Sequence, residues 1–173
     1  MEKNQLKDFY DYHAWANSQI FNRLKELPEE IVTLEMTSAF PTIAKVLVHL
    51  YFTDSLWLGI MSGKSMKEGL EAFQQKRAET ELKPLSELEA LYEETAARYK
   101  ILLEAEEDFN KQLVVENPYA GPLKTTIAET ILHIVTHGSY HRGNIAAMLR
   151  QQGQASVMQD FGLYLYAGKQ KTP

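Results

Sequence analysis

Apolar residues recur at helical spacing along four long stretches of the chain, and this periodicity restricts the possible fold more than any other feature. The stretches cover residues 4–27, 43–61, 84–103 and 126–152. The second stretch is apolar on almost every face, which is typical of a helix buried on all sides. Because connections of moderate length join the four helices, the sequence predicts an all-α fold built as an antiparallel four-helix bundle.

Residues with strong preferences for helix ends mark the boundaries of these stretches. Pro28 ends the first stretch, and Thr42 opens the second. Thr126 and Glu129 have the spacing of a capping box at the start of the fourth stretch, and Gly153 stops it. These signals indicate separate helices joined by turns.

The segments outside the long helices carry weaker patterns. Ser-Gly-Lys-Ser at 62–65 breaks the second helix, and we expect a polar connection over residues 62–83. The run 112–116 precedes Asn-Pro-Tyr-Ala-Gly-Pro, which predicts a short β-hairpin before the fourth long helix. A short C-terminal helix is expected over residues 157–167. We expect residues 1–173 to form a single domain, because most domains have about 100–200 residues.

Composition excludes several classes of function. The chain has 18 Lys and Arg against 23 Asp and Glu, a net charge of −5, which disfavours a nucleic acid partner. We find no signal peptide and no apolar run of about 18 residues that could span a bilayer, so we expect a cytoplasmic protein without a membrane partner. The chain has no cysteine, so thiolate metal sites are excluded and any thiol chemistry must use an external thiol.

Histidine is the residue type whose placement points to chemistry. His133, His137 and His141 follow one another at intervals of four, His49 lies in the middle of the second helix, and His13 lies on the first. Two imidazoles four residues apart on a helix can converge on one ion. The ends of the triplet are about 12 Å apart along the helix axis, which is too far to share a small ion. One adjacent pair must therefore be chosen.

The helical wheel selects that pair. His137 and His141 face the interior edge of the fourth helix, whereas His133 points away, and His49 is the natural third nitrogen from a neighbouring helix. Three neutral donors with an open position are the pattern of a catalytic metal, and they suit zinc, nickel, cobalt or iron(II). The alternative is that these histidines only form hydrogen bonds in the core.

Two further positions limit the chemistry and the packing. Gly138 follows His137 where a zinc protease has glutamate, so peptide hydrolysis of that type is not supported. Asp54 lies on an apolar helix and must be paired, either by accepting from the N–H of an imidazole that binds the metal or in a structural bond, for example to Arg142, and we favour the structural bond. Arg142 itself has two possible roles, which are to attract an anionic co-substrate or to bind a buried partner.

Aromatic and amide residues outside the histidine set have two possible uses. Trp15 and Asn17 either line a pocket or fix the first helix to its neighbours, and core packing is the favoured use of the tryptophan. Tyr164 and Tyr166 are typical of packing or of a dimer surface.

The stretch HIVTHGSYHRGNIAAMLRQQG at 133–153, together with His49 and the opening YDYHAWANSQIF at 10–21, resembles the DinB/YfiT family of metalloenzymes. This family includes DNA-damage-inducible proteins of bacilli and is unrelated to the similarly named DNA polymerase. The resemblance covers essentially the whole chain. It implies a four-helix bundle that holds one divalent metal, zinc or nickel first, through His49, His137 and His141.

The resemblance also implies a range of activities. Members of the family include a mycothiol-dependent maleylpyruvate isomerase and bacillithiol S-transferases, so we expect S-transfer from a low-molecular-weight thiol to a small electrophile. Metal-dependent hydrolysis and a non-catalytic role in binding a metal or small stress-related ligand are the alternatives. The resemblance further implies a homodimer. His133 matches a histidine one turn before the ligand pair, with a supporting role near the metal or in the fold.

Overall fold

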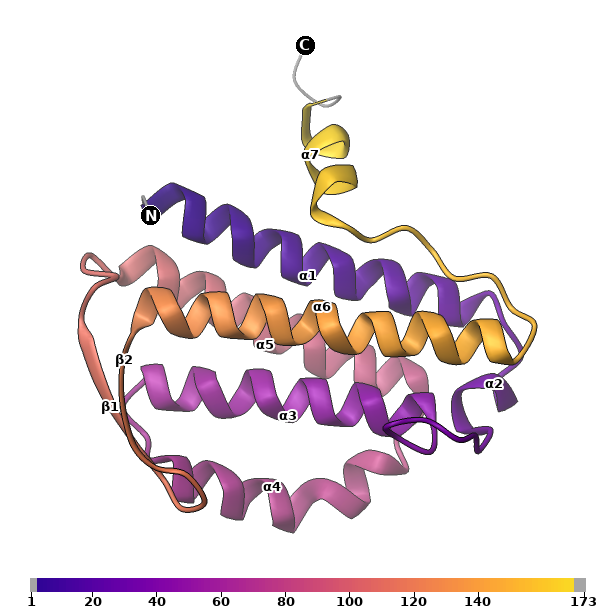
Figure 1. The fold of residues 1–173 in the computed structure, drawn as a ribbon, viewed down its shortest axis with the longest axis horizontal. Helices are drawn as coiled ribbons and strands as arrows, with labels where there is room; N and C mark the ends of the chain where they lie inside the picture. Colours follow the sequence, from indigo (N-terminus) through magenta and orange to yellow (C-terminus); the bar gives the residue numbers. More distant parts are fainter. Residues whose placement is uncertain (1–2, 170–173) are drawn as a thin grey trace.

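Four long helices form the body of the protein in the computed structural model, which describes residues 3–169. They are α1 (Lys3–Lys25), α3 (Ile43–Met61), α5 (Leu85–Ala105) and α6 (Ile127–Gln151), and they lie side by side (Figure 1). Each coincides closely with one of the stretches of helical periodicity. The predicted all-α four-helix bundle is therefore confirmed.

The signals for helix ends act as the sequence suggests. The Thr126 side chain accepts a hydrogen bond from the backbone N–H of Glu129, whose carboxylate accepts one from the backbone N–H of Thr126. Thr42 caps α3 by accepting from the backbone N–H of Lys45. Gly153 follows α6 with a φ of 74°, a left-handed conformation that glycine adopts without steric cost. The ends of α6 are thus determined locally.

Contacts between the helices define the order of the bundle. Both α1 and α3 contact α5 and α6. Antiparallel packing holds between α1 and α5 and between α3 and α6 (Figure 1). Helices α3 and α5 instead run in the same direction. The hydroxyl of Tyr92 donates to the backbone carbonyl of Leu47, and the hydroxyl of Tyr99, seven residues later, donates to that of Asp54, also seven residues later. A further helix lies between α3 and α5 in the chain and returns it to the end of the bundle where α3 begins, so α5 can run in the same direction.

That helix, α4 (Met66–Glu81), lies where we expected a polar connection over residues 62–83, so this prediction was wrong. Ser65 and Glu68 form a capping box at its start. Only Met66 and Thr80 are buried on α4. The helix therefore needs few apolar residues, and its sequence shows only weak apolar periodicity. The helix packs on the outer side of α3 and against the hairpin, so most of its side chains face water.

Shorter elements complete the fold. The predicted hairpin is present as β1 (Gln112–Asn117) and β2 (Gly121–Thr126), paired antiparallel. The C-terminal helix α7 (Phe161–Lys169) begins four residues later than predicted. One helical turn, α2 (Glu30–Thr33), precedes the irregular segment that leads into α3. The extent of the domain stays a prediction, and both of its ends lie outside the described residues.

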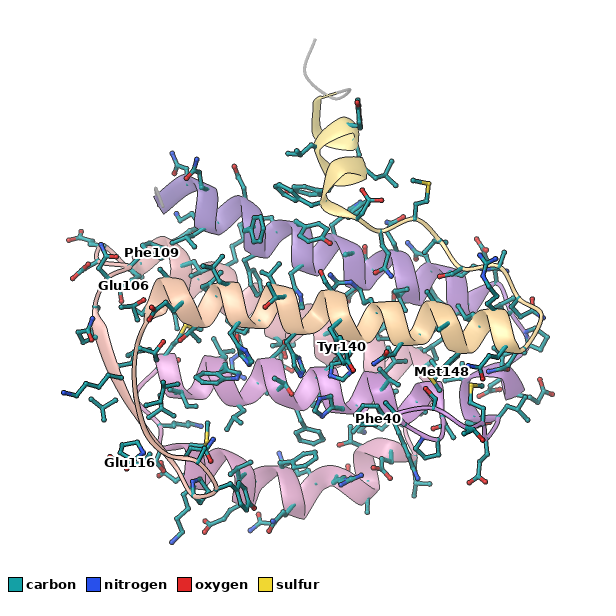
Figure 2. The ribbon with its side chains drawn as sticks, in the orientation of Figure 1. Phe40, Glu106, Phe109, Glu116, Tyr140 and Met148 are labelled. Carbon is teal, nitrogen blue, oxygen red and sulfur yellow. The ribbon has the colours of Figure 1, made fainter. Side chains whose placement is uncertain are left out.

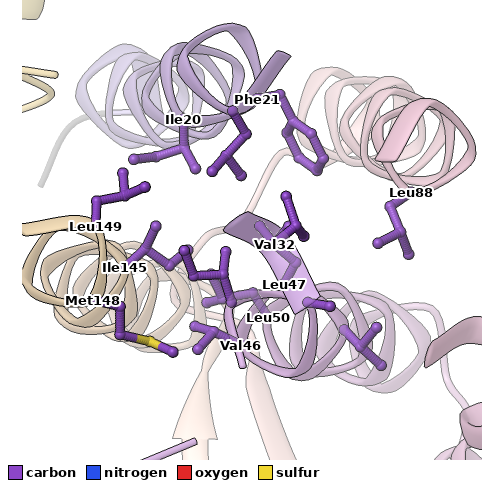
Figure 3. Packing of buried hydrophobic residues seen from close by; sticks show 14 of the residues in the cluster. Ile20, Phe21, Val32, Val46, Leu47, Leu50, Leu88, Ile145, Met148 and Leu149 are labelled. Atoms are coloured by element: carbon purple, nitrogen blue, oxygen red, sulfur yellow. The ribbon is translucent and has the colours of Figure 1, made fainter. Parts of the chain in front are cut away.

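Among the described residues, two large apolar clusters with polar residues between them fill the bundle, and a third, small cluster lies between α3, α4 and β1. Figure 3 shows the first cluster, to which the four long helices contribute Ile20, Phe21, Leu47, Leu50, Leu88, Ile145 and Leu149 among others. The second cluster includes Leu6, Tyr10, Tyr99, Ile131 and Ile134. Between the clusters, α1, α3 and α6 place four polar residues that are at most 6% exposed, namely His13, Asn17, Asp54 and Arg142. We call these four residues the polar layer.

Helix α3 is long and apolar enough to cross a membrane by length and composition. Its 18-residue window has a mean hydropathy of 1.2, contrary to our expectation of no such run, because Lys45 and Asp54 are its only charged residues. Half of that window is buried inside the protein. The core helix of a bundle passes the same test, so this helix is weak evidence for a membrane span.

The packing predicts a large difference between two isoleucines on long helices. Ile145 is fully buried on α6, and Ile101 on α5 is 68% exposed. We expect Ile145→Ala to lower the free energy of unfolding by about 2–5 kcal/mol, because it leaves a cavity in the core. Ile101→Ala is expected to change it by less than about 0.5 kcal/mol. Urea unfolding monitored by circular dichroism measures both, and equal effects would contradict the proposed core.

Candidate metal centre

The structure brings together the three histidines that the sequence selects. His49 from α3 and His137 and His141 from α6 each offer a ring nitrogen, and these nitrogens all lie within 4.8 Å of one another. Nε2 of His49 is 3.2 Å from Nε2 of His137. The middle of α3 thus faces the middle of α6. Binding of a metal by this group stays a prediction.

Aromatic rings surround the three imidazoles. The Phe40 ring, just before α3, has its centroid 5.0 Å from that of His49 and 5.5 Å from that of His141. The Tyr140 ring is 4.9 Å from His141. Figure 2 shows Phe40 and Tyr140 in the same region, beside α3 and α6. Sequence reasoning missed Phe40, since Phe40 lies in an irregular segment, where no periodicity indicates which way a side chain points.

The environment keeps the three imidazoles neutral. Burial, followed by repulsion from neighbouring histidines, lowers the pKa of His137 to about 3. Burial and the nearby His49 lower the pKa of His141 to about 4. Burial, followed by the charge of Arg77, also lowers the pKa of His49. Near pH 7 the rings are therefore unprotonated, which is the state that a metal ligand requires.

The arrangement of nitrogen atoms fits a divalent cation. The 3.2 Å between Nε2 of His49 and Nε2 of His137 is close to the separation of two nitrogens that bind one ion at about 2.1 Å. The group of three contains no carboxylate or thiolate within the described part of the chain. Three imidazoles suit zinc, nickel, cobalt or iron(II). The Asn144 amide lies 3.3 Å from Nδ1 of His141, and its position three residues later on the same helix face was a signal that we missed.

The fourth histidine of the region lies outside the group. The ring of His133 packs against Trp57, with centroids 5.1 Å apart, and its centroid is 5.6 Å from that of His137. One turn of α6 thus separates it from the three nitrogens that converge. His133 extends the aromatic surroundings of the site toward α3.

The fifth histidine joins the polar layer behind the site. Nε2 of His13 lies 2.8 Å from Oδ2 of Asp54, and Nη1 of Arg142 lies 3.3 Å from Nδ1 of the same ring. Arg142 also donates to Oδ1 of Asn17 at 2.8 Å and to Oγ of Ser139 at 3.1 Å. Asp54 thus forms a structural bond, as favoured, but the named partner Arg142 was wrong, because the His13 imidazole lies between the two charges. The alternative, in which Asp54 accepts from an imidazole that binds the metal, is not what the structure contains, since His13 lies outside the group of three.

A glycine allows this approach. Gly138 lies next to the His13 ring, and a Cβ atom there would meet Cε1 and Nδ1 of that ring well inside van der Waals distance. It lies between His137 and His141 in the chain. The same turn of α6 therefore carries two histidines toward the site and leaves room for His13 behind them.

The remaining aromatic candidates belong to the packing of α7. Tyr164 packs on Tyr12 and Trp15, with ring centroids 5.8 and 5.5 Å apart. Tyr166 is 71% exposed. The predicted packing role thus holds for Trp15 and Tyr164, and Tyr166 lies on the surface. Asn17 belongs to the polar layer.

Comparisons with known proteins agree with this architecture. The model of the DinB family matches residues 1–172. Protein DinB from Bacillus subtilis (strain 168) is 48% identical over 160 residues, which cover 92% of this chain and 93% of that protein.

Among solved structures, YfiT from Bacillus subtilis superposes with a TM-score of 0.67 over 90% of this chain and 91% of that chain, at 15% identity. It is described as a probable metal-dependent hydrolase with an unusual four-helix bundle topology. At this identity the likeness concerns the fold.

Two glycines of α6 provide a test of the close approach. Gly138→Ala is expected to lower the free energy of unfolding by about 1–3 kcal/mol, because the added methyl group must displace the His13 ring. Gly143 has no atom within 4 Å of the corresponding position, so Gly143→Ala is expected to raise stability by up to about 1 kcal/mol. Denaturant unfolding measures both changes. A stabilising effect of Gly138→Ala would refute the close contact.

Proposed function

The chain belongs to the DinB family, and on that premise we propose that it is a metal-dependent enzyme that acts on a small molecule. His49, His137 and His141 hold one divalent cation, with zinc or nickel preferred and iron or cobalt as further possibilities. The observation that carries this proposal is the convergence of three neutral imidazole nitrogens within 4.8 Å from two helices. Three protein ligands leave a position for substrate, as in catalytic sites.

The reaction that we propose is transfer of an external thiol to a small electrophile. A divalent cation at this site lowers the pKa of a thiol or water and so supplies a nucleophile at neutral pH. The chain has no cysteine, so the sulfur comes from a low-molecular-weight thiol. A carbon–sulfur bond forms, the bond to the leaving group breaks, and the thiol proton leaves with that group or to solvent.

The chain's own residues favour a thiol over water. Phe40 and Tyr140 supply aromatic surfaces beside the three imidazoles, and such surfaces suit an apolar electrophile. Among the described residues, no carboxylate oxygen joins the three nitrogens within 4.8 Å of one another. A thiol needs a carboxylate as general base less than water does, because it is the stronger acid.

Hydrolysis is the second candidate. It is favoured by the fold shared with YfiT, whose description as a probable metal-dependent hydrolase applies to that protein. Both candidates use the same three histidines. They differ in whether the nucleophile is an added thiol or water.

The setting of the reaction completes the proposal. We place it in the cytoplasm, where low-molecular-weight thiols are kept reduced. We also propose a homodimer, which is supported by exposed apolar side chains such as Tyr140, Leu165 and Tyr166 on α6 and α7. Such surface is common at contacts between subunits.

Metal content tests the ligand set. Purified protein is expected to bind about one divalent ion per chain, and His49→Ala or His137→Ala is expected to remove it, because two nitrogens are too few. His133→Ala is the matched control on the same helix, and it should keep its metal. Elemental analysis measures content, with circular dichroism to verify folding. Equal metal in wild type and His137→Ala would exclude this site.

Turnover tests the reaction. With a chloronitroaromatic electrophile, we expect product only when both metal and a thiol are present, and we expect chelation of the metal to abolish it. The rate should depend on a group with a pKa well below the 8.5 or so of a free thiol, because a cation favours the thiolate. Absorbance of the thioether product measures the rate.

The alternatives give distinct results. If activated esters are cleaved equally fast without added thiol, water is the nucleophile and the protein is a hydrolase. If a small ligand binds tightly at the metal and no thiol or electrophile of a broad panel is turned over, both reactions are excluded and the protein has a binding role.

A further inference from the structure

A cavity of about 270 Å³ lies between α1 and α5, separate from the histidine site between α3 and α6. Small side chains such as Ala14 and Ala96 leave this space open. Tyr10, Phe21 and Tyr92, all buried, contribute aromatic walls. The volume is slightly below the 300 Å³ or so at which pockets for drug-sized ligands begin, so a suitable ligand is small.

The deepest charged residue of the cavity wall has a free acceptor. Asp54 reaches the wall from α3 and is 3% exposed. Its Oδ2 is bound to His13 at 2.8 Å, whereas its Oδ1 is buried without a hydrogen-bond partner among the described residues. An unpaired buried acceptor is costly, and one that belongs to a carboxylate especially so. A donor brought by a ligand would remove this cost.

The charges around the cavity favour a cation. The wall includes three carboxylates, those of Asp54, Glu89 and Glu93, and no lysine or arginine. Glu89 is bound to Lys25 at 2.8 Å, and Glu93 is exposed at the mouth. Burial, followed by the charge of Asp54, raises the pKa of Tyr10 well above its ordinary value, so this phenol stays neutral. The wall thus combines negative charge with uncharged aromatic rings.

We propose that this cavity binds a small organic monocation, in which a primary ammonium group donates to Oδ1 of Asp54 and a flat apolar body lies against Tyr10 and Tyr92. An ammonium group supplies three donors, and aromatic faces attract it further. A bare metal ion fits less well, because Ca²⁺ or Mg²⁺ requires about six oxygen ligands and most of this wall is apolar. The site is independent of the reaction proposed for the three histidines.

Binding of a model cation tests the proposal. Benzylammonium and benzyl alcohol have nearly the same shape and differ in charge, so their comparison isolates the interaction with Asp54. We expect benzylammonium to bind the purified full-length protein at pH 7 at least tenfold more tightly than benzyl alcohol, as measured by isothermal titration calorimetry. Metal content is measured in parallel, so that loss of the histidine site is recognised separately.

Three variants locate the binding. Asp54→Asn keeps the side-chain shape and is expected to weaken benzylammonium binding at least tenfold. Ala96→Leu narrows the cavity from α5, which contributes no residue to the polar layer, and it should also weaken binding, which keeps the test valid if Asp54→Asn does not fold. Glu94→Gln is the control, because Glu94 is an exposed carboxylate on the same helix but outside the cavity wall, and it should change affinity less than threefold.

Several outcomes would overturn the proposal. A dissociation constant above about 10 mM for benzylammonium means that the cavity takes no such ligand. Equal affinity for benzyl alcohol means that Asp54 does not select charge. Unchanged binding in Ala96→Leu places the ligand elsewhere on the protein.

Discussion

The contact of His13 with Asp54 and Arg142 is the interaction on which the rest of the structure depends. It joins α1, α3 and α6 in the middle of the bundle, where the side chains of all three residues are nearly inaccessible to water. Removing one member of a buried ionic set costs about 3–5 kcal/mol, because the other charge is left uncompensated. Apolar side chains tolerate small sliding movements, whereas these hydrogen bonds do not. The polar layer therefore determines how the three helices are aligned.

This alignment is what the histidine site requires. Successive residues of a helix are turned by about 100°, so His137 and His141 face one side while Gly138 and Arg142 face the bundle interior. Nitrogens from two helices lie within 4.8 Å of one another only if α3 and α6 keep a definite axial position. Metal sites tolerate displacements of only about 0.5 Å. Residues behind the site thus hold it in place without touching it.

Sequence patterns predicted the parts of the fold that depend on local signals. The long helices, the capping box at Thr126 and the hairpin each follow from neighbouring residues, and all are present. Helix α4 was missed because it buries little apolar surface and therefore lacks the periodicity that indicates a helix. The partner of Asp54 was missed for another reason. His13 is 41 residues away in the chain, and no local spacing connects them.

The sequence by itself determined which histidines are candidates for a metal site, because interval and helix face follow from the geometry of a single helix. It also determined that any reacting thiol is external, since the chain has no cysteine. Only the tertiary structure decided that Phe40 covers the imidazoles, that His13 separates Asp54 from Arg142, and that one oxygen of Asp54 has no partner. These features depend on how helices distant in sequence are packed. Such packing is set by the sum of many weak contacts, which no single motif encodes.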